Sequence, residues 1–148
     1  MYSRILIATD GSKLAGHAVE HGLQLAKTVD ANVIILMVSE LLSSLYMAGE
    51  AAFGELDSFK AYEDAAEQSA EDILKGAAEQ ATTIGVAAET RHVKGRRPAE
   101  GILDTAELED CNLIVMASNG RRGLQKMLIG SQTSEVMALS KRPVLVLR

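Results

Sequence analysis

Residues 113–117 read Leu-Ile-Val-Met-Ala, an unbroken apolar run that is followed at once by Ser118, Asn119 and Gly120. A strand that is apolar at every position, rather than at every second one, is covered on both faces, as the strands of parallel sheets are. Similar runs lie elsewhere in the chain, at 5–9, 33–38 and 144–147, with a weaker one at 86–93. The sequence therefore predicts five strands in a sheet that is buried between helices.

Small and apolar residues at helical spacing separate these runs. The first predicted helix follows Ser12, a typical N-cap, and the second spans 59–84 and ends before Gly85, a typical C-terminal cap. The third begins at Pro98, and the fourth begins near Ser131 and carries Val136 and Leu139. The predicted inward stripe of the second helix consists of Tyr62, Ala66, Ala70, Ile73, Ala77, Ala81 and Ile84.

Strands and helices alternate along the chain. This alternation requires right-handed crossovers and predicts an α/β fold with a doubly wound, five-stranded parallel sheet in the order 3-2-1-4-5. At 148 residues the chain has the length of one domain, so we expect a single domain over 1–148. In such sheets ligands bind at the carboxyl ends of the strands, where the winding direction reverses.

Composition excludes several classes of protein. The formal net charge of −5 repels nucleic-acid phosphates, so we expect no nucleic-acid partner. The N-terminal apolar run meets Asp10 too early for a signal peptide or a membrane span, so we expect no membrane partner. Cys111, the single cysteine, has the apolar neighbours of a buried thiol. A cytoplasmic location is the prediction that fits these features.

The segment 40–58 interrupts the alternation. It mixes large apolar residues with Gly49 and Gly54 and is longer than typical connections in such folds. We expect a covering loop with a short helix; a lid or a partner surface is the alternative.

The residues after 113–117 have three features of an anion site. Gly120 and Gly130 lack Cβ, so backbone N–H groups can approach an oxyanion and the chain can adopt a positive φ. Ser131 and Thr133 open a helix, whose N-terminal N–H groups and dipole favour phosphate. Three cations add local positive charge: Arg121, Arg122 and Lys126. A surface turn followed by a capped helix fits the same spacing, so both interpretations remain open at this point.

The loop also resembles the nucleotide-binding motif of the universal stress protein family, which reads Gly, two residues, Gly, nine residues, and Gly-Ser or Gly-Thr. Gly120, the nine residues 121–129 and Gly130-Ser131 match this motif, and Ala117 stands in place of its first glycine. Further matches are Ala8-Thr9-Asp10-Gly11-Ser12, Val38, Gly95-Arg96-Arg97-Pro98 and Arg142-Pro143-Val144-Leu145-Val146. The chain is similar to the family from residue 5 to residue 147.

The resemblance implies a Rossmann-like fold related to the adenine nucleotide alpha hydrolases, and a site for ATP, AMP or ADP, which Mg²⁺ can accompany. In that site Asp10 and Val38 would face ribose and adenine, and Ala8 and Thr9 would line the same wall. The positions beside the ribose would be Met116 and Ala117. The positions at the phosphates would be Gly120, Arg121, Gly130, Ser131, Gln132 and Thr133.

Three functions stay open. The first is a nucleotide-binding stress-response sensor or regulator with at most slow hydrolysis, because the sequence offers no general base or arginine finger. The second is a nucleotide-free dimeric interaction protein of the same family, and the third is a weak ATPase with Asp10 as its acidic candidate. Asp10 also has a simpler interpretation as a cap of the first helix together with Ser12. We predict no catalytic residue and no metal site, because His17 and His21 lack a third ligand.

The last strand, within 143–148, is an edge strand in the predicted order. It reads Val-Leu-Val-Leu without a charge, which makes it an open template for pairing. We expect a homodimer joined through this strand, and a regulatory protein partner that the sequence does not identify.

Overall fold

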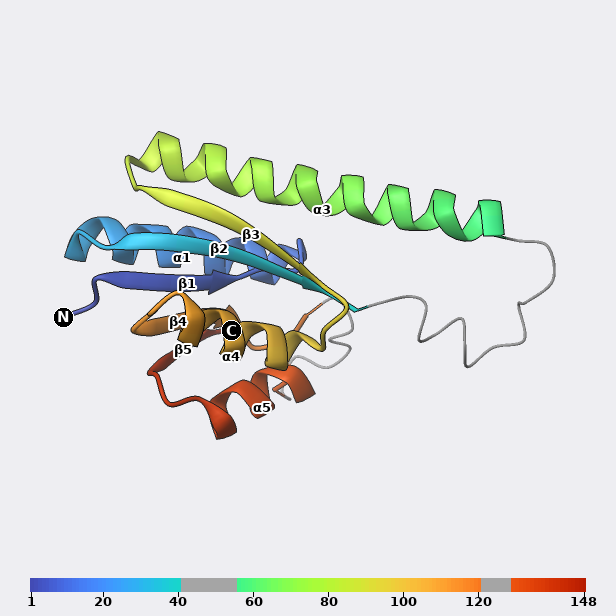
Figure 1. Cartoon of the computed structure of the whole chain (residues 1–148). Coiled ribbons are helices and arrows are strands. Elements are labelled where there is room, and N and C mark those ends of the chain that lie inside the picture. The colour runs from blue at the N-terminus through green and yellow to red at the C-terminus, as the bar shows by residue number, and fades with distance from the viewer. Residues whose placement is uncertain (41–55, 121–128) are drawn as a thin grey trace.

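Five strands form one parallel sheet, which lies in the middle of the molecule (Figure 1). The structure, a computed structural model, describes residues 1–40, 56–120 and 129–148. The strands are β1 (Arg4–Ala8), β2 (Asn32–Ser39), β3 (Ala88–Lys94), β4 (Leu113–Ala117) and β5 (Val144–Leu147). Their order is β3-β2-β1-β4-β5, and all four neighbouring pairs are parallel. The predicted fold class and strand order are confirmed, and the winding direction reverses between β1 and β4.

Four described helices cover the two faces of the sheet. They are α1 (Lys13–Val29), α3 (Leu56–Ile84), α4 (Pro98–Leu108) and α5 (Ser131–Leu139). In Figure 1, α3 and α1 lie on one side of the strands, and α4 and α5 lie on the other. The result is a three-layer α/β arrangement in which the central strands are covered by helices on both faces.

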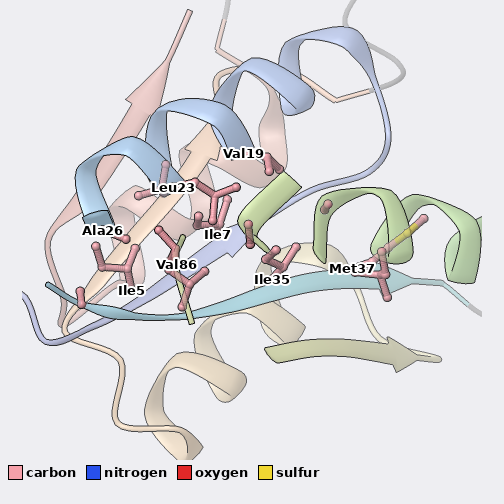
Figure 2. Close-up of a cluster of buried hydrophobic side chains, with 14 of the residues drawn as sticks. Ile5, Ile7, Val19, Leu23, Ala26, Ile35, Met37 and Val86 are labelled. Carbon is pink, nitrogen blue, oxygen red and sulfur yellow. The ribbon is translucent and has the colours of Figure 1, made fainter. Parts of the chain in front are cut away.

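The core on the α1 and α3 side is built from odd-numbered residues of the central strands. Figure 2 shows Ile5, Ile7 and Ile35 of the sheet facing Leu23 and other residues of α1. Gly22 allows this close packing, because a Cβ there would lie 2.5 Å from Ile7 Cδ1. Successive strand residues point to opposite faces, so the even-numbered residues belong to the other core.

The core on the α4 and α5 side contains Leu6, Leu36 and Ile114, which are fully buried. The inward face of α4 carries Ala99, Ile102 and Ala106, which are buried, and Leu103, which packs against the cluster. Gly101 brings α4 close to the sheet, because a Cβ at this position would lie 2.7 Å from Val38 Cγ2.

Helix caps follow the sequence signals closely. Ser12 is the N-cap of α1, and its Oγ accepts a hydrogen bond of 3.2 Å from the Ala15 N–H. Pro98 occupies the first position of α4. Gly85 follows α3 with a φ of 86°, the left-handed conformation of a C-terminal cap.

The predictions for α3 and α5 need correction at exposed apolar positions. α3 begins at Leu56, so residues 56–58 of the segment 40–58 are helical, while 41–55 lie outside the described residues. Tyr62 is 61% exposed and Ala66 is also exposed, although the helical spacing predicts that both face inward. The reason is length: a helix of 29 residues spans about 44 Å, whereas a strand of eight residues spans about 26 Å. The N-terminal half of α3 therefore extends past the sheet (Figure 1), and Leu139 near the end of α5 is likewise 61% exposed.

Charged side chains close the sheet near its amino ends. Arg4 donates to the Glu109 carboxylate at 2.8 Å, and Arg91 donates to the same carboxylate at 3.1 Å. Arg91 also pairs with Glu89 at 2.8 Å, which lowers the pKa of Glu89 and raises that of Arg91. The Asn112 side chain accepts from the N–H groups at the start of β1. These contacts connect the end of α4 to β1 and β3.

Within the described residues, no helix combines the length and the apolar character that a membrane crossing requires.

Candidate functional site

A cavity of about 760 Å³ opens at the carboxyl ends of β1, β2 and β4. This is the position at which the winding direction reverses, and the volume lies within the range of about 300–1,000 Å³ that small-molecule sites have. The strands, the starts of three helices and the turn after β4 supply its lining residues, which are Ala8, Thr9, Asp10, Ala15, Leu36, Met37, Val38, Ser39, Glu40, Pro98, Ile102, Met116, Ala117, Asn119, Gly120, Ile129, Gly130, Ser131, Gln132 and Thr133. Of the site residues predicted from the sequence, all but Arg121 lie in this one cavity. Arg121 is outside the described residues, as are Arg122 and Lys126.

The end of β1 is held by local hydrogen bonds. Thr9 N–H donates to the Leu36 carbonyl at 2.9 Å, and Thr9 Oγ1 accepts from the Gly11 N–H at 3.2 Å. Asp10 Oδ1 accepts from the Ser12 N–H at 2.9 Å. Asp10 therefore supports the N-cap residue Ser12 and does not itself accept from an N–H of the helix in this bond, and its carboxylate lines the cavity at the same time.

Ala117, which replaces the first glycine of the family motif, lies in regular strand conformation. It is the last residue of β4, pairs with Leu147 of β5, and has no positive φ. It is 7% exposed and packs against Ala15 and Ala18 of α1. Glycine is thus not required at this position for backbone conformation, and the remaining question is how closely a ligand approaches the methyl group.

Gly120 and Gly130 do not adopt the positive φ that glycine would allow, because neither has a φ in the left-handed region. Instead, their lack of a Cβ allows neighbouring atoms to pack closely against them. A Cβ on Gly120 would lie 2.6 Å from Asp10 Oδ2, and one on Gly130 would lie 3.3 Å from Asn119 Oδ1. The Gly130 N–H also donates to the Ser118 carbonyl at 2.8 Å, which fixes the turn against the end of β4.

The N-terminus of α5 points its unsatisfied backbone donors at this cavity. Gly130 is the N-cap and supplies no side-chain acceptor, and the first helical hydrogen bond runs from the Ser134 N–H to the Gly130 carbonyl at 2.9 Å. The N–H groups of Ser131, Gln132 and Thr133 therefore precede the helical ladder, and all three residues line the cavity. Such a helix end favours an anion through its N–H groups and its dipole.

Two predicted phosphate residues use their side chains differently from the expectation. Thr133 is buried, and its hydroxyl donates to the Ala117 carbonyl at 2.9 Å, so its backbone N–H is the group open to a ligand. Gln132 Oε1 accepts the Ala99 N–H at 2.9 Å and so provides a cap for α4, whose own N-cap, Arg97, supplies none.

The described lining residues that carry a charge are Asp10 and Glu40, and both are acidic. The positive charge predicted for this site resides on Arg121, Arg122 and Lys126, which lie outside the described residues. Within the described part, anion attraction comes from helix N-termini rather than from side-chain charge, and α5 is the helix whose first N–H groups are unsatisfied.

Several lining residues were absent from the sequence predictions. Pro98 and Ile102 line the cavity from α4, and Ser39 lines it from the end of β2. The signal that could have found them is topological, since α4 begins directly after the carboxyl end of β3. Ser39 Oγ also lies 2.8 Å from Nε2 of His92 on β3. Burial, followed by the charge of Lys94, lowers the pKa of His92.

Other candidate sites have a structural explanation. Among residues 1–40, 56–120 and 129–148, no group of three potential metal ligands is present. His17 and His21 are exposed on α1, and His21 Nδ1 lies 3.0 Å from the His17 carbonyl. Cys111 is fully buried, as predicted, and burial raises the pKa of its thiol.

Comparison with known proteins agrees with the fold. The profile of the Universal stress protein family matches residues 1–148. The universal stress protein YxiE of Bacillus subtilis is 33% identical over 152 residues, which cover 100% of both chains. The solved structure of MJ0577, a universal stress protein of Methanocaldococcus jannaschii, superimposes with a TM-score of 0.82 at 26% identity, covering 99% of this chain and 96% of that one. A universal stress protein from Archaeoglobus fulgidus, solved in complex with dAMP, has the same fold with a TM-score of 0.71 at 20% identity, covering 99% and 98%. The chain therefore belongs to the universal stress protein family.

Proposed function

We propose that this universal stress protein binds an adenine nucleotide, ATP or alternatively AMP or ADP, in the cavity at the carboxyl edge of the sheet. The observation that carries this proposal is the α5 N-terminus, where three residues with open backbone donors face the cavity. A phosphate group satisfies such donors better than a neutral ligand does. The complex of the Archaeoglobus fulgidus relative with dAMP supports the same ligand class.

The two ends of the cavity suit the two ends of a nucleotide. Val38, Ile102 and Met116 form an apolar region in which an adenine ring would be held. Thr9 and Asp10 lie at the end of β1, where polar groups would meet the ribose. The phosphates would reach the N–H groups at the start of α5, and Mg²⁺ would be carried in by the phosphate oxygens of ATP.

We propose a role in sensing or regulation, with slow hydrolysis at most. Asp10 is the candidate base at the end of β1, but one of its oxygens already accepts a hydrogen bond from Ser12. Release of phosphate from ATP above background, abolished by Asp10→Ala, would instead favour the weak ATPase.

A nucleotide-free interaction protein is the second candidate, and the edge strand β5 favours it. β5 carries no charge, and Leu145 is 39% exposed. We propose that a second copy of the chain pairs with this edge, in a cytoplasmic setting where a further regulatory partner acts. Analytical ultracentrifugation should detect a dimer that Leu145→Lys weakens, and a concentration-independent monomer would contradict this assembly.

Thermal unfolding with and without Mg-ATP tests the nucleotide proposal directly. A ligand at about 100 times its dissociation constant adds about 2.7 kcal/mol to the free energy of unfolding. ATP, ADP, AMP and adenosine should be compared in parallel. The absence of any shift with all four would contradict the proposal and favour the nucleotide-free candidate.

Two variants distinguish an effect on ligand binding in the cavity from an effect on the stability of the fold. Gly130→Val adds a branched side chain where the nearest heavy atom to a Cβ is already 3.3 Å away, so we expect a loss of ATP affinity of about 100-fold or more. Ala117→Gly restores the motif glycine. We expect it to bind ATP within about twofold of wild type and to lose about 0.5–1 kcal/mol of stability, because glycine weakens a strand. A large gain in affinity would mean that the Ala117 methyl group obstructs the ligand.

A further inference from the structure

Gln132 joins the N-termini of α4 and α5, which both lie beside the cavity. It is the second residue of α5, and its side chain reaches α4, where its Oε1 accepts the Ala99 N–H at 2.9 Å. It is partly buried and lines the cavity. The side chain is thus held in place by a contact between residues 33 positions apart.

This hydrogen bond fixes which way the amide group faces. A backbone N–H can only donate, so the amide oxygen of Gln132 must be the atom next to Ala99. The amide nitrogen, with two N–H donors, is then the other terminus of the group. Within the described residues this nitrogen has no hydrogen-bond partner.

From this arrangement, and resting on the proposed function, we propose that Gln132 is a specificity-determining residue. Its amide nitrogen donates to an oxygen atom of the bound nucleotide, next to the backbone donors of α5. A residue that only capped α4 would need an acceptor and nothing more. Glutamine supplies that acceptor and adds a donor group, which a carboxylate at the same position would lack.

The proposed contact is pre-organised. Ordering a free glutamine side chain costs rotamer entropy, and part of this cost is already met by the bond to Ala99. The oxygen that accepts from the amide belongs either to a phosphate or to a ribose hydroxyl. The two sources are distinguished by comparing nucleotides that differ in phosphate number with adenosine.

The experiment uses the full chain and isothermal titration calorimetry with ATP, AMP and adenosine. Gln132→Glu keeps an acceptor for Ala99 and replaces the donors by a carboxylate. We expect its melting temperature to stay within about 1 °C of wild type and its ATP affinity to fall about tenfold or more. If adenosine binding is unchanged the contact is to a phosphate, and if adenosine binding falls equally the contact is to the ribose. Gln24→Glu, at an exposed position of α1, is the matched control for the added charge.

Gln132→Met separates the loss of donors from charge repulsion, because it is neutral and similar in size. We expect ATP affinity to fall about three- to tenfold, with a lower melting temperature from the lost cap. Wild-type affinity for ATP and AMP in Gln132→Met would overturn the inference, since charge alone would then explain Gln132→Glu. Wild-type affinity in both variants would reduce Gln132 to a cap and leave the proposed function intact. If the wild-type chain binds none of the three ligands, the proposed function and this inference fail together.

Discussion

The amino and carboxyl edges of the same sheet differ in how their polar groups are hydrogen-bonded. At the amino edge, Arg4 and Arg91 both donate to the Glu109 carboxylate, and Asn112 accepts from the start of β1. At the carboxyl edge, the N-terminus of α5 has no side-chain cap and faces a cavity of about 760 Å³. The amino edge pairs its charged side chains within the protein, although Arg4 Nε is a buried donor that has no partner among the described residues. The carboxyl edge leaves the backbone donors at the start of α5 open to a ligand.

The difference follows from the residues that each edge can use. Long charged side chains at the amino edge reach from β1 and β3 to the end of α4. The carboxyl edge is lined by short residues such as Ala8, Ala117 and Gly130, so the described strand ends leave the cavity open. We therefore expect mutations at the amino edge to change stability without changing binding, and mutations that add atoms to the cavity wall at the carboxyl edge to lower binding more than stability.

The largest effect on stability is expected at the amino edge, for Glu109→Ala. The substitution leaves Arg4 and Arg91 without the carboxylate that both of them contact, and the side chain of Glu109 is only 25% exposed. Charge-assisted hydrogen bonds of this partly buried kind predict a loss of about 2 kcal/mol, or about 4–8 °C in melting temperature. Chemical denaturation measures this loss, and ATP affinity should be unchanged.

Lys141 and Glu107 provide the control for that prediction. They form an ion pair of 3.9 Å whose side chains are 84% and 70% exposed, so Glu107→Ala should change stability by less than about 0.5 kcal/mol. Equal losses of stability in Glu109→Ala and Glu107→Ala would show that the hydrogen bonds of Glu109 to Arg4 and Arg91 do not stabilise the amino edge. A drop in ATP affinity in Glu109→Ala would contradict the separation of the two edges.

The next effect is expected at the carboxyl edge, for Gly120→Ala. The added methyl would lie 2.6 Å from Asp10 Oδ2, so the carboxylate must move away from the position that Ser12 holds. We expect ATP affinity to fall about five- to tenfold, with a stability change below about 1 kcal/mol. Calorimetric titration and thermal unfolding of the same sample measure both quantities.

Gly76→Ala is the matched control, because Gly76 lies in α3 and a Cβ at this position would have nothing within 4 Å of it. It should gain about 0.5–1 kcal/mol of stability from helix propensity and leave binding unchanged. If Gly120→Ala binds ATP as tightly as Gly76→Ala does, the contact between Gly120 and Asp10 has no role in the site.

The fold was predictable because its signals are local. Unbroken apolar runs mark β1, β2 and β4, and the alternation of strands with helices leaves little choice of topology. The predicted stripe of α3 extends too far for a physical reason. Tyr62 and Ala66 continue the periodicity of the buried residues, and periodicity alone does not reveal where the sheet beneath the helix ends.

The site was predictable only where a local rule applied. The glycines and the helix start at Ser131 stand in one short stretch, so the anion-binding geometry could be inferred from it. The contacts that join distant segments could not be inferred, among them the bond from Ala99 to Gln132 and the packing of Gly120 on Asp10. Such pairs depend on how α4, α5 and β1 converge, which spacing along the chain does not encode.

The smallest effect concerns pH, and it should arise at the carboxyl edge, where His92 Nε2 lies 2.8 Å from Ser39 Oγ beside the cavity. Burial and the charge of Lys94 lower the pKa of His92, and the charges of Glu67 and Glu71 oppose this shift. The unfolded chain, in which the pKa of histidine is about 6.5, therefore binds this proton first as the pH falls. The contribution of His92 to the free energy of unfolding is therefore fully present above about pH 6.5. It is lost as the pH falls from that value towards the lower pKa of His92 in the folded protein.

A histidine variant isolates this contribution from the other shifted groups. The shifted carboxylates, Glu67 and Glu89, have pKa values lowered from 4.5 and titrate below this window. His92→Gln keeps a partner for Ser39 without titrating, so its free energy of unfolding should depend less on pH between about 7.5 and 5.5, as chemical denaturation at a series of pH values measures. His17→Gln, at an exposed position of α1, is the matched control and should keep the wild-type slope. If the free energy of unfolding depends on pH with the same slope in wild type, His92→Gln and His17→Gln, another group causes the dependence. The prediction for His92 would then be wrong.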